Sequence, residues 1–219
     1  MTALPLLSLA CVSVWVALVV IAQLLNPEQS ALSMGMSGLV TGRGGWIMRI
    51  AFVVRGASAI TLVGALSDLV PEAARSDLGM ALLAVWGGGS ALLAAYDTDM
   101  PGDEPTAHGR GHAVIAFVAY AAAAVGMVLV SVALGGAEAT ADTARWALPI
   151  ALLAEVALAA QFAGFAAAAR DEAAAREARA AAAPEAPPAY GGLGRFAGLL
   201  QRVFLSLVML WTALVAAGL

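Results

Sequence analysis

Long uninterrupted runs of apolar residues alternate with short polar segments along this chain. Six of the runs are long enough to cross a hydrocarbon core of about 30 Å, for which a helix needs roughly 20 residues. They cover residues 4–25, 46–70, 78–96, 113–134, 146–169 and 196–219. Because lipid offers no hydrogen-bond partner to a free backbone group, each run is predicted to be an α-helix. The pattern predicts an all-α integral membrane protein, a bundle of six transmembrane helices forming one domain over residues 1–219.

Composition supports a membrane protein and excludes several other classes. Of 219 residues, 62% are hydrophobic and 12% are charged, whereas soluble domains have about 25% charged residues. The chain has no Lys, which excludes a retinal Schiff base and a Walker-type phosphate site. Its one cysteine, Cys11, excludes a disulfide framework. A net charge of -4 without a basic groove gives no reason to expect a nucleic-acid partner, and the sequence predicts no cofactor.

The arginines predict how the chain is oriented in the membrane. Eight of them lie in or beside the connectors after the first, third and fifth runs: Arg43, Arg49, Arg110, Arg170, Arg176, Arg179, Arg195 and Arg202. The opposite side has Arg75 and Arg145. By the positive-inside rule, those three connectors are expected in the cytoplasm, and both termini outside a bacterial inner or plasma membrane. The first run lacks a preceding basic segment and is too long for a typical signal peptide, so we expect it to be retained as a helix.

The connector at residues 170–194 has two parts of different character. Residues 166–183 are alanines interspersed with Arg and Glu, a composition that strongly favours helix and predicts a charged extension of the fifth span into water. Three prolines and three glycines follow, and they predict a flexible link to the last helix. The extension serves either as a solvated spacer, the interpretation we favour, or as a docking helix for a protein partner.

The connector between the third and fourth runs, YDTDMPGDEPTAHGRGH at residues 96–112, contains four carboxylates and both histidines of the chain. His108 and His112 are four residues apart, the spacing of histidines that share a zinc ion on one helix face. However, Gly109 and Gly111 disfavour a helix before position 111, and no Glu base lies between the histidines. A metal site is therefore not favoured; one would need Asp99 or Asp103 beside the two histidines. The bland alternative is a solvated loop in which His112 caps or anchors the next helix.

Three segments together resemble a known family. They are ALSMGMSGLVTGRGGWIMRIAF from Ala31, LLAAYDTDMPGDEPTAHGRGH ending at His112, and GLLQRVFLSLVMLWTALVAAGL at the C-terminus. They are similar to the bacterial six-helix membrane proteins grouped as domain of unknown function 998. The matching motif positions are Ser33, Gly45 and Trp46, then Thr98 and Asp99, then Gly109 and His112, whereas Tyr96 and Asp97 stand where the family has Phe and Pro. The resemblance implies the fold and no particular activity.

The motif positions lie at one membrane face and predict a polar cluster there. Arg49 is about one turn into the second helix, so we expect it to meet Asp99, with His112 and Ser33 nearby. Such a cluster binds a polar head group or a small anion, or it ties loops to helices. The structural tie is the interpretation we favour.

Two further charged residues are expected near the middle of the bilayer. Arg55 and Glu155 are each about nine residues into their helices, which at roughly 1.5 Å per residue places both deep in the membrane. Ionisable groups at such depth usually face the protein interior and pair. We therefore predict an Arg55–Glu155 ion pair with Gln161 as a polar neighbour, acting either as a buried tie or as a proton or substrate relay.

Three function hypotheses follow from these features. The first is a transport-like bundle that binds a lipid or small amphiphile, and it predicts a cavity reaching Arg55 and Glu155. The second is a membrane-embedded metal-dependent hydrolase that uses Asp99, His108 and His112. The third is a structural subunit that binds a protein partner through the extended fifth helix, with a packed interior. We favour the first; the sequence identifies neither a catalytic nucleophile nor a substrate.

Overall fold

The computed structural model of the protein describes residues 2–100, 102–181 and 191–219. Its α-helices are α1 (Ala3–Leu25), α2 (Gly45–Leu69), α3 (Asp77–Leu92), α4 (Ala107–Leu134), α5 (Glu138–Ala181) and α6 (Ala197–Ala217). A 3-10 turn continues α3 through Leu93–Ala95, and others occur at Met36–Val40, Glu72–Ala74 and Gly194–Phe196. Within the described chain, six helices are long and apolar enough to cross a membrane. The predicted six-helix membrane bundle is therefore confirmed.

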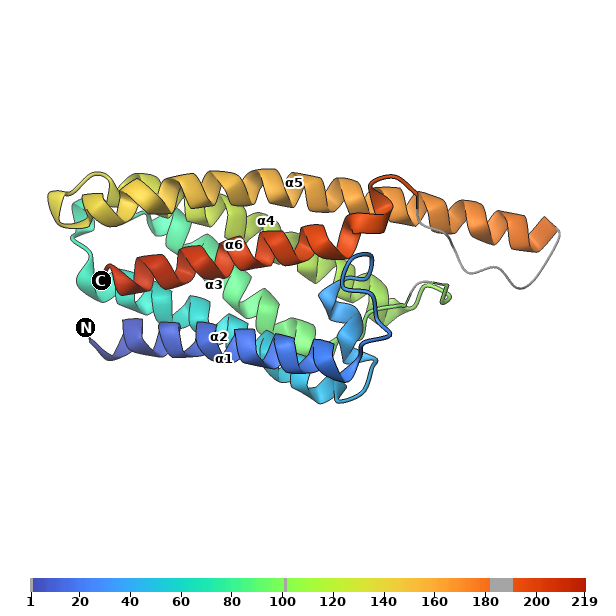
Figure 1. The fold of residues 1–219 in the computed structure, drawn as a ribbon. Coiled ribbons are helices and arrows are strands. Elements are labelled where there is room, and N and C mark those ends of the chain that lie inside the picture. The colour runs from blue at the N-terminus through green and yellow to red at the C-terminus, as the bar shows by residue number, and fades with distance from the viewer. Residues whose placement is uncertain (1, 101, 182–190) are drawn as a thin grey trace.

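The helices lie side by side along one common direction, and the chain termini emerge at the same end of the bundle (Figure 1). Each helix packs on the next one along the chain, from α1 on α2 through α5 on α6, and α1 also contacts α6. The connectors α1–α2 and α3–α4 lie together at the end opposite the termini (Figure 1). That end, which we call the connector end, contains the motif positions found in the sequence.

Small residues let the helices of the core approach closely. A Cβ on Gly56 of α2 would lie 2.5 Å from the backbone oxygen of Gly87 on α3, and one on Gly126 of α4 would lie 3.0 Å from the oxygen of Gly79. Large apolar side chains fill the remaining interior, with Phe52, Trp86, Phe204 and Trp211 at most 2% exposed. The glycines in these helices therefore serve close packing, as small residues do between membrane helices.

Helix α4 begins earlier than the sequence predicted. Its first residue is Ala107 rather than residue 113, so His108, Gly109 and Gly111 are all helical. The Thr106 hydroxyl caps the helix by accepting the N–H of Gly109 at 2.9 Å. The expectation that two glycines prevent a helix here is wrong, because the cap and the packing around the glycines outweigh their low helix propensity.

Helix α5 has 44 residues and continues well beyond its predicted span. The predicted charged extension is confirmed as a helix as far as Ala181, and it projects from the bundle at the connector end (Figure 1). Most of the predicted Pro- and Gly-rich link, residues 182–190, lies outside the described residues. Pro149 lies within α5.

Candidate functional site

The α1–α2 connector, residues 26–44, is held against the bundle by polar side chains. The side-chain amide of Asn26 donates to the carbonyl oxygens of Ala22 at 2.8 Å and Arg43 at 2.9 Å, and its oxygen accepts the Arg43 N–H at 2.6 Å. From α6, the Arg202 guanidinium donates to the carbonyl oxygens of Ala31 at 2.9 Å and Met34 at 2.8 Å. The connector is therefore tied at its two ends by Asn26 and near its middle by Arg202.

The Gly-Trp motif marks the start of α2. Gly44 has a φ of +67°, in the left-handed region that favours glycine. A Cβ on Gly45 would lie 1.8 Å from the Val40 carbonyl oxygen, so a side chain there would displace the connector. Trp46 is 63% exposed, as expected of an aromatic anchor at a membrane interface.

Asp99 is held by the first turn of α4. Its carboxylate accepts the Thr106 hydroxyl at 2.7 Å and the Thr106 N–H at 3.0 Å. A Cβ on Gly109 would lie 2.0 Å from the same carboxylate. The Thr106 hydroxyl, then its N–H, lower the pKa of Asp99 below its ordinary value by stabilising the ionised form. The matching positions Asp99 and Gly109 thus form one contact: the carboxylate fits only because Gly109 has no side chain.

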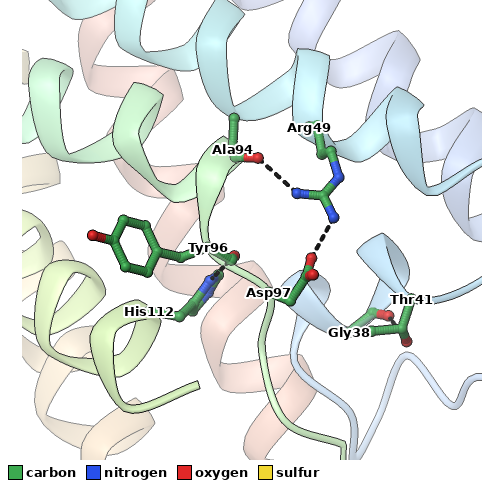
Figure 2. Close-up of polar contacts among 7 residues, drawn as sticks. All are labelled: Gly38, Thr41, Arg49, Ala94, Tyr96, Asp97 and His112. Carbon is green, nitrogen blue, oxygen red and sulfur yellow. Dashed lines mark hydrogen bonds and ion pairs between the residues drawn. The ribbon is translucent and has the colours of Figure 1, made fainter. Parts of the chain in front are cut away.

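Arg49 ties α2 to the α3–α4 connector, although its acidic partner differs from the predicted one. The guanidinium donates to the Ala94 carbonyl at 2.7 Å and forms an ion pair with Asp97 (Figure 2). The sequence predicted Asp99 as the partner. That assignment is wrong because Asp99 is engaged by Thr106, which leaves the neighbouring carboxylate to face α2.

The two histidines of α4 both contact Tyr96, and they do so in different ways. The His112 Nδ1 lies 2.9 Å from the Tyr96 carbonyl oxygen (Figure 2), and the His108 ring packs on the Tyr96 ring with centroids 5.6 Å apart. A Cβ on Gly111 would lie 2.8 Å from the same ring. In the described part of the chain, no group of three or more His, Cys, Asp or Glu side chains is arranged to hold a metal ion. The structure therefore does not assemble Asp99, His108 and His112 into a metal site.

A cavity of about 600 Å³ opens at the connector end, a volume within the roughly 300–1,000 Å³ of small-molecule sites. Its middle is apolar, with Ala116 and Phe117 from α4 facing Phe162 and Phe165 from α5. Its inner end has the polar side chains of Tyr120 and Gln161, the lining residues farthest from the connector end along α4 and α5. His112 and Gln201 also line it, about one turn into α4 and α6, and all four are at most 5% exposed. Of the predicted polar cluster, Ser33, Asp99 and His112 line this cavity, whereas Arg49 does not.

The mouth of the cavity is formed by the α3–α4 connector and the α5 extension. Glu172 accepts the Gly102 N–H at 2.5 Å, and Arg176 donates to the Asp103 carbonyl at 2.6 Å. The acidic side chains that line the cavity, Asp99, Asp103 and Glu172, all belong to this mouth. The α5 extension is therefore part of the site wall, in addition to projecting into water.

Arg55 is fully buried at 0% exposed and does not form the predicted ion pair. Its Nε donates to the Ser90 hydroxyl at 3.1 Å, while Nη1 and Nη2 have no hydrogen-bond partner in the described chain. The guanidinium instead faces the rings of Phe52 at 5.4 Å and Tyr120 at 5.8 Å. Glu155 is half-buried, and neither residue lines the cavity, so the prediction of a cavity that reaches Arg55 and Glu155 is wrong. The pair does not form because α2 and α5 are not packing neighbours among the described residues.

Several residues of the site were not predicted from the sequence. Gln201 accepts the Met36 N–H at 2.6 Å and lies 3.4 Å from the Tyr120 hydroxyl, so it links the connector to the cavity. Asn26 and Arg202 were also missed as ties. The signal in the sequence that could have found them is a polar side chain within or at the edge of an apolar span. Such groups are rare in lipid and usually face the protein interior.

Comparisons with known proteins identify the family. The model of the family described as protein of unknown function (DUF998) matches residues 9–218. The comparisons with curated proteins and with solved structures found no match. Because the family model covers nearly the whole chain, the chain belongs to this family, as the resemblance of the motifs predicted.

Proposed function

We propose that this member of the DUF998 family binds a lipid or small amphiphile in the cavity at the connector end. The observation that carries the proposal is the distribution of groups along the cavity. Along α4 and α5, the polar side chains of Tyr120 and Gln161 lie at its inner end and charged side chains lie at its mouth, with aromatic and small apolar side chains between them. A molecule with a polar head and a hydrocarbon chain matches such a site, whereas a fully polar solute would leave the apolar middle unmatched.

The wall between α4 and α5 supports entry from the bilayer. Phe117 lines the cavity and is 56% exposed. Its ring contacts Phe162 of α5, with centroids 5.1 Å apart. One pair of aromatic side chains therefore separates the cavity from the lipid, and rotation of these rings would let a hydrocarbon chain pass between the two helices.

The experiment compares lipids that copurify with two Phe variants. Ala116→Phe fills the cavity, whereas Ala163→Phe adds the same group on an exposed position of α5 outside it. We expect native mass spectrometry of the gently solubilised protein to show a bound amphiphile in the wild type and in Ala163→Phe, and at least about tenfold less in Ala116→Phe. Equal occupancy in all three proteins, or none in the wild type, would contradict the proposal.

We further propose that the mouth of the cavity faces the cytoplasm of a bacterial cell, with the termini outside. The arginine distribution supports this orientation by the positive-inside rule. In a Cys11→Ser background, Ser30→Cys at the connector end and Glu72→Cys at the opposite end report the two sides, since both positions are exposed. A membrane-impermeant maleimide added to intact cells is expected to label position 72 and not position 30. The reverse pattern would invert the orientation.

A further inference from the structure

Arg55 has the properties of an incomplete binding site. An arginine stays protonated under all physiological conditions, and each of its five N–H groups is a hydrogen-bond donor that needs an acceptor. Here the side chain is 0% exposed, and both terminal nitrogens lack a partner among the described residues. Only one neutral hydroxyl, that of Ser90, accepts from it. Buried charges in membrane proteins are normally paired, so a buried guanidinium with two free ends indicates that an acceptor comes from outside the chain.

The inner part of the cavity lies one side-chain layer from this guanidinium. Arg55 faces the ring of Tyr120, and Tyr120 lines the cavity. His112 also lines it and packs on Phe52, whose ring Arg55 faces from 5.4 Å. Among the described residues, the Tyr120 hydroxyl has a hydrogen bond only from Gln201 at 3.4 Å, near the long limit of such a bond. Rotation of Tyr120 would therefore open the cavity to Arg55 at the cost of this weak hydrogen bond and of the ring contacts with Phe204 and Arg55.

Charges along the cavity favour one direction of binding for an anionic molecule. Asp99, Asp103 and Glu172 line the mouth beside the cation Arg176, so the acidic groups outnumber the basic one there and disfavour an anion. No acidic side chain lines the inner part among the described residues, and the uncompensated Arg55 charge lies behind it. An oxyanion is thus stabilised most at the inner end, where the surroundings are least polar and Coulombic attraction is strongest. Its hydrocarbon chain would then pass Phe117 and Phe162 toward the bilayer.

We infer that Arg55 binds the carboxylate or phosphate of an acidic amphiphile, with Tyr120 as the side chain that separates it from the cavity. The inference rests on the proposed amphiphile-binding function and adds the chemical class of the head group. A carboxylate or a phosphate pairs with both terminal nitrogens of a guanidinium at once, which neutral head groups cannot do with equal strength. The two oxyanions correspond to two sources, a free fatty acid and a phosphate-bearing lipid.

The test uses three probes with the same twelve-carbon chain: dodecanoate, dodecyl phosphate and the neutral dodecanol. The full-length protein is reconstituted in nanodiscs of zwitterionic phosphatidylcholine, and binding is measured with tritiated probes at a pH where the carboxyl group is ionised. We expect the wild type to bind at least one anionic probe at least about tenfold more tightly than dodecanol. The stronger of the two anions identifies the carboxylate or the phosphate source.

Three variants separate the role of Arg55 from general effects of charge and folding. Arg55→Gln is expected to lose the preference for the anion while binding dodecanol as before, and Arg55→Lys to keep part of it. Arg49→Gln, which removes an arginine outside the cavity, is expected to keep the full preference. If Arg55→Gln fails to fold, the inference is tested by the anion preference of Arg55→Lys and by the head groups of the lipids that copurify with the wild type.

The outcomes distinguish this inference from the function on which it rests. Equal binding of dodecanol and both anions by the wild type, or an undiminished preference in Arg55→Gln, overturns the inference and leaves the amphiphile site standing. Recovery of only neutral lipids with the purified wild-type protein would also overturn the inference and leave the amphiphile site standing. If the wild type binds none of the probes, or if Ala116→Phe does not abolish their binding, the proposed function fails and the inference fails with it.

Discussion

The polar groups at the connector end and the buried guanidinium of Arg55 differ in how completely their hydrogen bonds are satisfied. At the connector end, Asp99 accepts two bonds from Thr106, and Arg49 binds both a carbonyl and Asp97. These side chains are largely solvent-accessible, with Arg49 37% and Asp97 55% exposed. Arg55 is inaccessible, and two of its nitrogens have no hydrogen-bond partner in the part of the chain that the structure describes. The satisfied groups are explained by loop and helix structure, whereas Arg55 is not explained by the fold.

This difference suggests which polar residues of a membrane bundle to investigate for function. A satisfied polar cluster stabilises the loops that it joins, and its removal costs stability. An unsatisfied buried charge lowers the stability of the unliganded protein and is retained despite that cost. The following predictions test the contrast, beginning with the largest expected effect.

Replacing Arg55 by an apolar side chain should stabilise the unliganded protein. Arg55→Met removes a buried charge that lacks a partner, and it keeps much of the packing volume. An arginine at the centre of a membrane helix costs about 2.5–3.5 kcal/mol, so we expect a gain of about 2 kcal/mol after loss of the Ser90 bond and the aromatic contacts. The measurement is the thermal unfolding midpoint of delipidated protein in neutral detergent. A lower midpoint would mean that the protein itself already satisfies Arg55.

Adding one methyl group at Gly109 should destabilise the connector end. The new Cβ would displace the Asp99 carboxylate from Thr106, and overpacking of this kind costs about 1–3 kcal/mol. Helix propensity alone predicts the opposite sign, a gain of up to about 1 kcal/mol.

Gly88 of α3 is the matched control for Gly109. It is exposed, and a Cβ there would have no atom within 4 Å. Gly88→Ala should therefore leave the unfolding midpoint unchanged or raise it, while Gly109→Ala lowers it. If the two variants behave alike, the contact between Asp99 and Gly109 has no energetic role.

The ion pair between Arg49 and Asp97 should contribute less. Both side chains are partly exposed, and such pairs typically contribute about 0.2–1 kcal/mol. A double-mutant cycle with Arg49→Gln and Asp97→Asn in chemical unfolding would measure the coupling. A coupling energy well above that range would show that the pair is shielded from water by lipid head groups.

The smallest expected effect is a pH dependence of the stability of the fold that comes from Asp99. Its pKa is lowered in the folded protein, mainly by the Thr106 hydroxyl, so the ionised form stabilises the fold. This stabilisation is present above the unfolded pKa of about 3.9 and is lost as the pH falls through the lower folded value. The difference in unfolding midpoint between wild type and Asp99→Asn should therefore shrink from pH 6 to pH 3. A difference that grows over this range would contradict the assignment.

Hydropathy was sufficient to predict the helices, because lipid permits few other backbone structures. It did not predict where α4 begins. That boundary depends on the Thr106 cap and on the side chains of Asp99 and Tyr96, from the preceding connector, which occupy the space beside Gly109 and Gly111. Propensity assigns these two glycines to a loop, whereas tertiary packing makes them necessary in a helix.

The candidate site was only partly predictable for a related reason. Position along a span gives depth, which is why Arg55 was recognised as buried, but depth does not give the direction in which a side chain faces. Predicting whether Arg55 pairs with Glu155 requires the direction in which each side chain faces, and this direction is set by how whole helices pack. Ties such as Gln201 to Met36 join residues more than 160 positions apart and have no local signature.

The contact between Asp99 and Gly109 has a consequence for how these two positions evolve within the family. Neither residue can change freely while the other is kept, since any side chain at 109 occupies the position of the carboxylate and loss of the carboxylate leaves the Thr106 hydroxyl and N–H without their acceptor. Substitutions at the two positions should therefore be coupled along each lineage. Two positions ten residues apart that change together would record this loop geometry in the sequences of related proteins.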